Sequence, residues 1–235
     1  MAVQLRFLPE TLEAPEYNCS AHTPEQWTVL YGTPQTLLGL WSLTFATVCQ
    51  ILYLPSLRVF YRERKMTCYK IMHFLALADF GGITCVGSLF GYAMLQGLVY
   101  CSDVRFSWIM GVGVCCCWYV STGTCALLVV NRISELLLRA RLLQGWRSSL
   151  AMAIILAYGV TVTLFTRLVY PNSPHTTVAF EPFIPGHTVE EYPNLFNMTH
   201  NFSVSFIIPF LYIVYIAIFT QASIICFFNV TTAAA

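Results

Sequence analysis

The sequence predicts an all-α fold, a polytopic membrane bundle of five transmembrane helices. The chain of 235 residues is 57% hydrophobic and only 10% charged, whereas soluble domains usually carry about 25% charged residues. Five apolar stretches are each long enough to cross a bilayer core, which takes roughly 20 residues of helix. The expected helices cover about 34–57, 71–95, 106–130, 148–169 and 202–228.

The basic residues predict the orientation of these helices. Five of the 12 Lys and Arg residues fall in 58–70, and four fall in 132–147. Short loops rich in Lys and Arg remain cytoplasmic, so we expect the N-terminus outside the cell and the C-terminus inside. The expected parts are an extracellular tail 1–33, a transmembrane bundle 34–228 with an outer loop 170–201, and a cytoplasmic tail 229–235. The bilayer is the expected partner, and nothing in the charge pattern suggests nucleic acid.

Proline and small residues have different structural consequences in the individual segments. The first helix contains Pro55 near its inner end, where a kink is tolerated in a membrane. The second and third helices are rich in small residues, which let helices approach closely. The outer loop 170–201 contains five prolines, a density that forbids a regular helix. Two interpretations of this loop stay open, a lid over the outer mouth of the bundle and a disordered connector.

The cysteines predict a single disulfide. Seven of the ten lie in or at membrane helices, and Cys68 lies in a cytoplasmic, reducing loop. The two that remain, Cys19 and Cys101, are expected outside, where a bridge between them can form; two free thiols are the alternative. The triplet Cys115–Cys117 is not expected to hold a metal, because consecutive helix positions point about 100° apart. No metal or other cofactor is expected.

Asn-x-Ser/Thr sequons predict a glycoprotein. Asn18, Asn197 and Asn201 lie in segments expected outside, where a glycan can be attached. Asn229 is expected in the cytoplasm and therefore unmodified.

Asp79 is the clearest candidate for a functional residue, since it is the only acid within an apolar span. A charge in the membrane interior costs about 2.5–3.5 kcal/mol on insertion scales, so this side chain should face the bundle and have a partner. Two interpretations remain. Asp79 is either an ion or proton site that switches helix packing, or a protonated acid bonded to a neighbouring helix. A small carrier or channel using Asp79 as its ion site is a further hypothesis.

The residues give no support for an enzyme. The sequence contains neither His-Glu-x-x-His nor Gly-x-Ser-x-Gly, and one intramembrane carboxylate cannot perform paired acid–base work. At the inner end of the third helix, Asn131 and Arg132 leave two interpretations open. Arg132 either contacts a cytosolic partner or is an anchor that reaches the membrane surface.

Several motifs together resemble a known family. Leu-Ala-x-x-Asp in the second helix, a Cys before the third and an Arg at its base resemble the seven-helix G-protein-coupled receptors. The nematode serpentine chemoreceptors of class T are a closer match. The motifs that carry this resemblance are Tyr17-Asn18-Cys19-Ser20, Leu52-Tyr53-Leu54-Pro55, Cys68-Tyr69-Lys70-Ile71-Met72, Asp79, Cys101, Trp118 and Asn131-Arg132.

The resemblance implies a chemosensory receptor in the plasma membrane, at the sensory cilium, that couples an external small molecule to a heterotrimeric G protein. By position, Asn131 and Arg132 would face the G protein, and Asp79 would be the buried polar switch. Receptor homo- or hetero-oligomers are also implied. The ligand-binding residues are not assigned.

The family has seven transmembrane helices, whereas this sequence has five apolar spans. We therefore expect a product truncated after the fifth helix and incomplete as a receptor. The alternative function is a non-signalling membrane partner that modulates full-length receptors through its small-residue faces.

Overall fold

The computed structural model describes residues 14–138 and 142–233, and all side chains among them except those of 138 and 225–233. The tail segments 1–13 and 234–235 lie outside the described residues, as does the Asn229 side chain that was expected to be unmodified.

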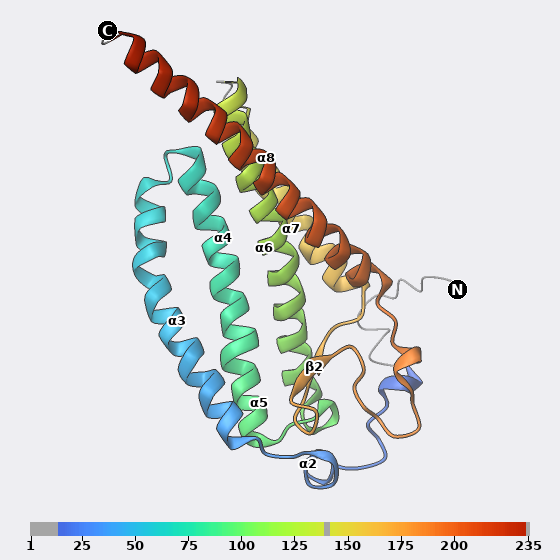
Figure 1. The fold of residues 1–235 in the computed structure, drawn as a ribbon. Helices are drawn as coiled ribbons and strands as arrows, with labels where there is room; N and C mark the ends of the chain where they lie inside the picture. The colour runs from blue at the N-terminus through green and yellow to red at the C-terminus, as the bar shows by residue number, and fades with distance from the viewer. Residues whose placement is uncertain (1–13, 139–141, 234–235) are drawn as a thin grey trace.

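Within the described residues, five helical spans are long and apolar enough to cross a membrane, which confirms the predicted fold class. The second span is built from three consecutive pieces, with a π-helical segment, η2, between two α-helices. Figure 1 shows the spans side by side as one bundle. Their bounds are α3 Thr36–Glu63, α4 Thr67–Ile83 with η2 Thr84–Leu89 and α5 Phe90–Gln96, α6 Val104–Leu138, α7 Trp146–Phe165 and α8 Leu195–Ala233.

The helix ends differ from the apolar stretches that predicted them. α3 and α6 continue to Glu63 and Leu138, because basic side chains and a helical backbone tolerate the membrane surface. The expectation that 170–201 holds no helix is wrong for its last part, since α8 begins at Leu195. The Asn194 side chain accepts the backbone N–H of Asn197 at 2.9 Å, an N-cap that starts the helix directly after the last proline of the loop.

The remaining short elements gather at one end of the bundle (Figure 1), which we call the disulfide end. The outer loop forms a hairpin there, in which Tyr170 pairs with Ala179. Its turn is tied to the loop that follows α5, because the Ser173 N–H donates to the Leu98 carbonyl at 3.2 Å. This ordered hairpin fits the lid interpretation better than a disordered connector. The short elements are η1 Pro15–Tyr17, α2 Pro24–Tyr31, η3 Tyr100–Ser102, β1 Tyr170–Asn172, β2 Thr177–Ala179 and η4 Val189–Glu191.

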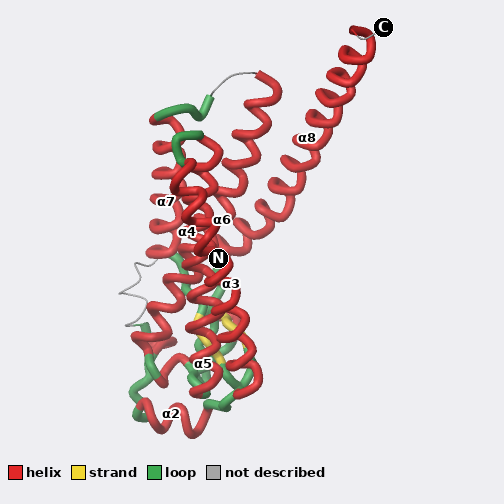
Figure 2. The backbone as a smooth tube through the Cα atoms, turned by 90° about the vertical axis from the view of Figure 1, so that its left-hand side faces the viewer, coloured by secondary structure: helices red, strands yellow, loops and turns green. Residues whose placement is uncertain are grey.

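Helix α6 is the centre of the bundle, with α4, α7 and α8 packed against it. Helix α8 crosses α6 near its own start, and its later part leans away from the other helices (Figure 2). The opposite end of the bundle carries the turns 64–66 and 142–145. We call it the basic end, because Lys65, Lys70 and Arg147 lie there.

Two glycines explain the close approach of α3 and α5. A methyl group at Gly91 would lie 2.9 Å from the backbone oxygen of Gly39, and one at Gly39 would lie 2.8 Å from the oxygen of Gly91. Backbone atoms cannot move aside as a flexible side chain can. By contrast, a methyl group at Gly82 would meet Cys117 at an ordinary contact distance of 3.7 Å.

We therefore expect opposite effects from one substitution at two positions. Gly91→Ala should destabilise the bundle by about 1–3 kcal/mol, because overpacking forces the helices apart. Gly82→Ala should be neutral or slightly stabilising, since Ala favours a helix over Gly by about 1 kcal/mol. The midpoint of thermal unfolding in detergent measures both. Equal loss of stability in the two variants would contradict the close approach.

Candidate functional site

The Asp79 carboxylate joins three helices near the middle of the bundle. Ser121 on α6 donates to its Oδ1 at 2.7 Å, and the Tyr53 hydroxyl on α3 donates to its Oδ2 at 3.3 Å. The predicted intramembrane acid therefore faces other helices and has hydroxyl partners. A carboxylate accepts several hydrogen bonds at once, so one side chain on α4 fixes the positions of two neighbours.

The same stretch of α6 also binds α8. The Trp118 indole N–H donates to Oδ1 of Asn201 at 2.8 Å, and the Tyr119 hydroxyl donates to Oδ1 of Asn197 at 3.2 Å. One turn further, Thr122 lies 3.0 Å from Nε2 of His200. Such bonds between membrane helices contribute about 0.6 kcal/mol each on average. We call this layer the polar belt; it consists of Tyr53, Asp79, Trp118, Tyr119, Ser121, Thr122, Asn197, His200 and Asn201.

The structure places the three sequons differently. Asn18 is exposed on a turn, where its Oδ1 accepts the backbone N–H of Ser20 at 2.9 Å. Asn197 and Asn201 lie inside α8, and their side-chain oxygens face α6. A bulky glycan on the α6-facing side would disrupt the packing of these helices. Asn18 is thus the accessible sequon of the three.

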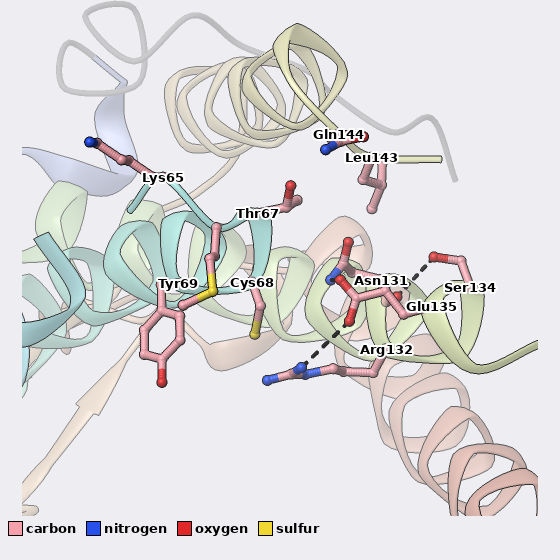
Figure 3. Close-up of a pocket in the computed structure, with 11 residues that line it drawn as sticks. Lys65, Thr67, Cys68, Tyr69, Asn131, Arg132, Ser134, Glu135, Leu143 and Gln144 are labelled. Carbon is pink, nitrogen blue, oxygen red and sulfur yellow. Dashed lines mark hydrogen bonds and ion pairs between the residues drawn. The ribbon is translucent and has the colours of Figure 1, made fainter. Parts of the chain in front are cut away.

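The basic end contains a cavity of about 350 Å³ between α4, α6 and the turn before α7 (Figure 3). Asn131 is buried and donates from Nδ2 to Oε1 of Glu135 at 2.9 Å. Arg132 lies beside it, 3.5 Å from Oε2 of the same carboxylate. Exposed ion pairs contribute only about 0–1 kcal/mol, so little free energy holds Arg132 to Glu135. The cavity is lined by Lys65, Met66, Thr67, Cys68, Tyr69, Asn131, Arg132, Ser134, Glu135, Leu143 and Gln144.

At the disulfide end, Cys19 and Cys101 are joined by a disulfide with a Cα–Cα distance of 5.5 Å. Next to it, the Tyr17 ring makes edge contacts with Tyr100, Tyr170 and Tyr192. Burial raises the pKa of Tyr100 and Tyr192 well above the usual tyrosine value. These two hydroxyls therefore stay protonated, and the four rings pack together as an aromatic cluster at the hairpin.

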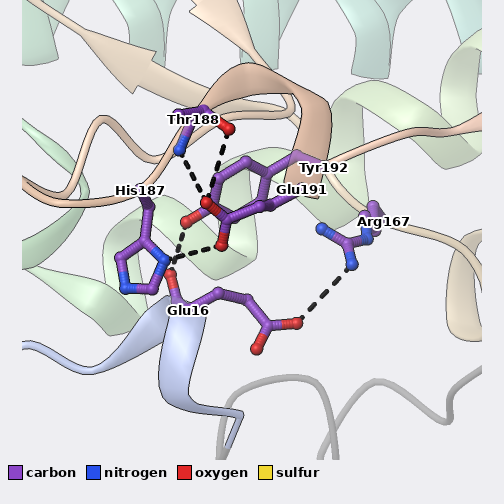
Figure 4. Close-up of polar contacts among 6 residues, drawn as sticks. All are labelled: Glu16, Arg167, His187, Thr188, Glu191 and Tyr192. Atoms are coloured by element: carbon purple, nitrogen blue, oxygen red, sulfur yellow. Dashed lines mark hydrogen bonds and ion pairs between the residues drawn. The ribbon is translucent and has the colours of Figure 1, made fainter.

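Charged groups at this end tie the N-terminal segment to the loop before α8 (Figure 4). Arg167 lies 3.5 Å from the Glu16 carboxylate and 5.2 Å from the centre of the Tyr192 ring. The Tyr192 hydroxyl donates to the backbone oxygen of Glu16 at 2.7 Å. In the loop itself, two hydrogen bonds lower the pKa of Glu191. The one from His187 has the larger effect, and the one from the Thr188 backbone N–H has the smaller. The segments that flank the hairpin are thus fixed on both sides.

The three consecutive cysteines in α6 serve packing. Cys115 is buried in the core, and Cys117 fills the space beside Gly81 and Gly82. Among the side chains that the structure describes, no group of three His, Cys, Asp or Glu residues is arranged to hold a metal ion.

Three of the polar-belt residues escaped sequence reasoning or were given another role. His200 was not singled out, although a histidine directly before the apolar stretch that begins at 202 is a visible signal. Asn197 and Asn201 were assigned as glycosylation sites, whereas the structure turns both toward α6.

Comparison with known proteins finds similarity over most of the chain. The sequence model of the family described as "Serpentine type 7TM GPCR chemoreceptor Srt" matches residues 5–218. Serpentine receptor class T-55 of Caenorhabditis elegans is 24% identical over 197 residues, which cover 80% of this chain and 53% of that receptor. The chain therefore spans about half the length of the curated relative that it matches.

Proposed function

This chain belongs to the Srt family of serpentine seven-transmembrane G-protein-coupled chemoreceptors, and on that premise we propose that it senses an external small molecule and signals to a heterotrimeric G protein. The observation that carries the proposal is the connection along α6. Helix α6 contributes Ser121 to the polar belt and Asn131 and Arg132 to the basic-end cavity. Ser121 and Arg132 are 11 residues apart on it, which corresponds to about 16 Å of helix.

Two independent features support an orientation with the disulfide end outside. Disulfides form in oxidising compartments, and the Cys19–Cys101 bridge is at this end. Lys and Arg residues favour the cytoplasm, and Lys65, Lys70 and Arg147 lie at the other end. We therefore place the basic end in the cytoplasm and the receptor in the plasma membrane, at the sensory cilium as the family suggests. Asn18 is then the residue that carries a glycan.

The basic-end cavity supplies the surface for the G protein. Glu135 holds Asn131 and Arg132 in one network at its edge. Because the bond between Arg132 and Glu135 is weak, a partner that offers backbone or side-chain oxygens can replace Glu135. Arg132 then donates to the partner, while Asn131 remains buried and keeps this part of α6 in place.

Asp79 serves as the switch between the outside and this cavity. Its carboxylate holds α3 and α6 together through Tyr53 and Ser121. A movement of α6 that breaks the bond from Ser121 changes the position of Arg132, because both lie on one rigid helix. Only a ligand that interacts differently with the two arrangements can drive this change.

Replacing Arg132 with Ala tests the proposal. The wild-type chain in cells should activate a co-expressed G protein, measured as subunit dissociation, when external chemical cues are applied. Arg132→Ala should reduce this response by about tenfold, as expected for the loss of one charge-assisted contact. The matched control is Arg147→Ala, which removes an exposed Arg from the same end and should leave the response unchanged. A wild-type chain that reaches the surface without responding, or equal losses in both variants, would contradict the proposal.

A further inference from the structure

A second cavity lies between α7 and α8, apart from Asp79 and from the basic end. Its volume is about 340 Å³, at the small end of the range for sites that hold organic ligands. Tyr158 and Phe196 form an aromatic wall, with ring centres 6.4 Å apart. The cavity is lined by Tyr158, Leu195, Phe196, Thr199, His200 and Ser203.

His200 is the fixed polar group of this cavity. Its Nδ1 lies 2.9 Å from the Tyr158 hydroxyl, and its Nε2 lies 3.0 Å from Oγ1 of Thr122. The Tyr119 ring meets the imidazole edge-on at 4.8 Å. Contacts with α6 and α7 thus hold the imidazole in one orientation. The hydroxyl group of a ligand can replace one of these hydrogen-bond partners of His200.

Two more hydroxyls at the cavity are free to bind. Among the described residues, the side chains of Thr199 and Ser203 have no hydrogen-bond partner, whereas Ser205 on the same helix donates to the Asn201 carbonyl at 2.8 Å. A hydroxyl in a membrane helix usually finds a partner, because lipid tails offer none. The cavity therefore combines an apolar aromatic wall with hydroxyl groups that are available to a guest.

The cavity opens sideways between two membrane-spanning helices. α7 and α8 both pack on α6, and the lining residues Leu195 and Phe196 are 39% and 41% exposed. Both belong to a helix that is long and apolar enough to cross the bilayer. A molecule that dissolves in the lipid can thus reach the cavity without passing the hairpin at the disulfide end.

From this geometry we infer that the cavity between α7 and α8 binds a small, lipid-partitioned aromatic molecule with a single hydroxyl head group. The aromatic ring stacks against Tyr158 and Phe196, and the hydroxyl bonds to both His200 and Ser203, with Thr199 beside them. A charged ligand does not fit, since none of the lining residues is Lys, Arg, Asp or Glu and charge is costly between membrane-spanning helices.

The cavity is also connected to the proposed switch, and this part of the inference rests on the proposed function. His200 contacts Thr122, which follows Ser121, the residue that donates to Asp79. A hydroxyl ligand that takes over the bond from His200 releases Thr122. Binding at the lipid-facing side thereby changes the same turn of α6 that holds Asp79.

Binding of 4-(trifluoromethyl)phenol to the chain in lipid nanodiscs, followed by fluorine NMR, tests the site without any G protein. We expect a saturable component above the linear partition into lipid. Ser203→Phe should fill the cavity and remove that component. The matched control Ser205→Phe places the same side chain on the same helix, outside the cavity lining, and should keep it.

A milder variant guards against misfolding of Ser203→Phe. Ser203→Ala should weaken binding of the phenol by about threefold to tenfold, as expected for one hydrogen bond. Binding of trifluoromethylbenzene, which has no hydroxyl, should stay the same in this variant. Linear partition alone in the wild-type chain, or binding that is equal in all variants, would overturn the inference and leave bilayer lipid as the occupant. Because binding is measured without signalling, its loss does not affect the proposed function, and its presence does not depend on that function.

Discussion

Replacing Cys101 with Ser should reduce the stability of this protein more than replacing any cysteine outside the Cys19–Cys101 bridge. Loss of a native disulfide typically costs about 2–5 kcal/mol, and long closed loops are at the upper end. The Cys19–Cys101 bridge spans 82 residues of sequence. It also holds η1 in place, where Tyr17 packs against three other tyrosine rings. Surface expression and the midpoint of thermal unfolding both measure the loss.

The pair of cysteines offers an internal control. Cys19→Ser should match Cys101→Ser, and the double variant should be no worse than either single one, because the bond is lost only once. Cys49→Ser removes a free, half-buried thiol from α3 and should change stability by no more than about 0.5 kcal/mol. Additive losses from Cys19 and Cys101 would mean that the two residues act separately and are not bridged.

The number of spans could be predicted because an apolar stretch of bilayer length is a local property of the sequence. The ends of the helices could not, because they depend on groups that the apolar pattern ignores. Asn194 shows this best: its side chain caps α8, so the helix starts seven residues before the apolar stretch at 202. Because of this difference, His200, which was expected in a loop, lies in a helix that faces α6.

The candidate site was predictable only in part, for a related reason. An acid within an apolar span is visible in the sequence, and Asp79 was found in this way. Its contacts with Tyr53 and Ser121 were not predicted, since they join residues 26 and 42 positions away in the sequence. The sequons at Asn197 and Asn201 led to a different role than the structure indicates, because a local motif does not reveal that both side chains point toward another helix.

Asp79→Asn should have the largest effect on signalling while it leaves the fold intact. The amide oxygen can still accept the hydrogen bond from Ser121 or Tyr53, so the cost in stability should stay near 1 kcal/mol. In the variant an amide NH2 group takes the place of one carboxyl oxygen, so one acceptor site of Asp79 is lost. We expect the cue-dependent response of the G protein, normalised to surface expression, to fall by about tenfold or more, as for a shift of about 1.4 kcal/mol between two helix arrangements.

Variants that lack the neighbouring hydroxyl groups distinguish a switch from a structural role for Asp79. Ser121→Ala removes the donor at 2.7 Å and should reproduce most of the signalling loss, whereas Tyr53→Phe removes the longer bond at 3.3 Å and should have a smaller effect. Thr47→Ala is the control, because this hydroxyl on α3 is exposed and bonds only to its own helix at Leu43. A switch predicts that the combined loss of signal in Asp79→Asn with Ser121→Ala is smaller than the sum of the two single losses, because both variants weaken the bond between Ser121 and Asp79. If thermal stability falls in both variants while the response per surface receptor is unchanged, Asp79 is a structural link between helices.

Ion flux that disappears in Asp79→Asn without any G-protein response would instead favour a carrier or channel.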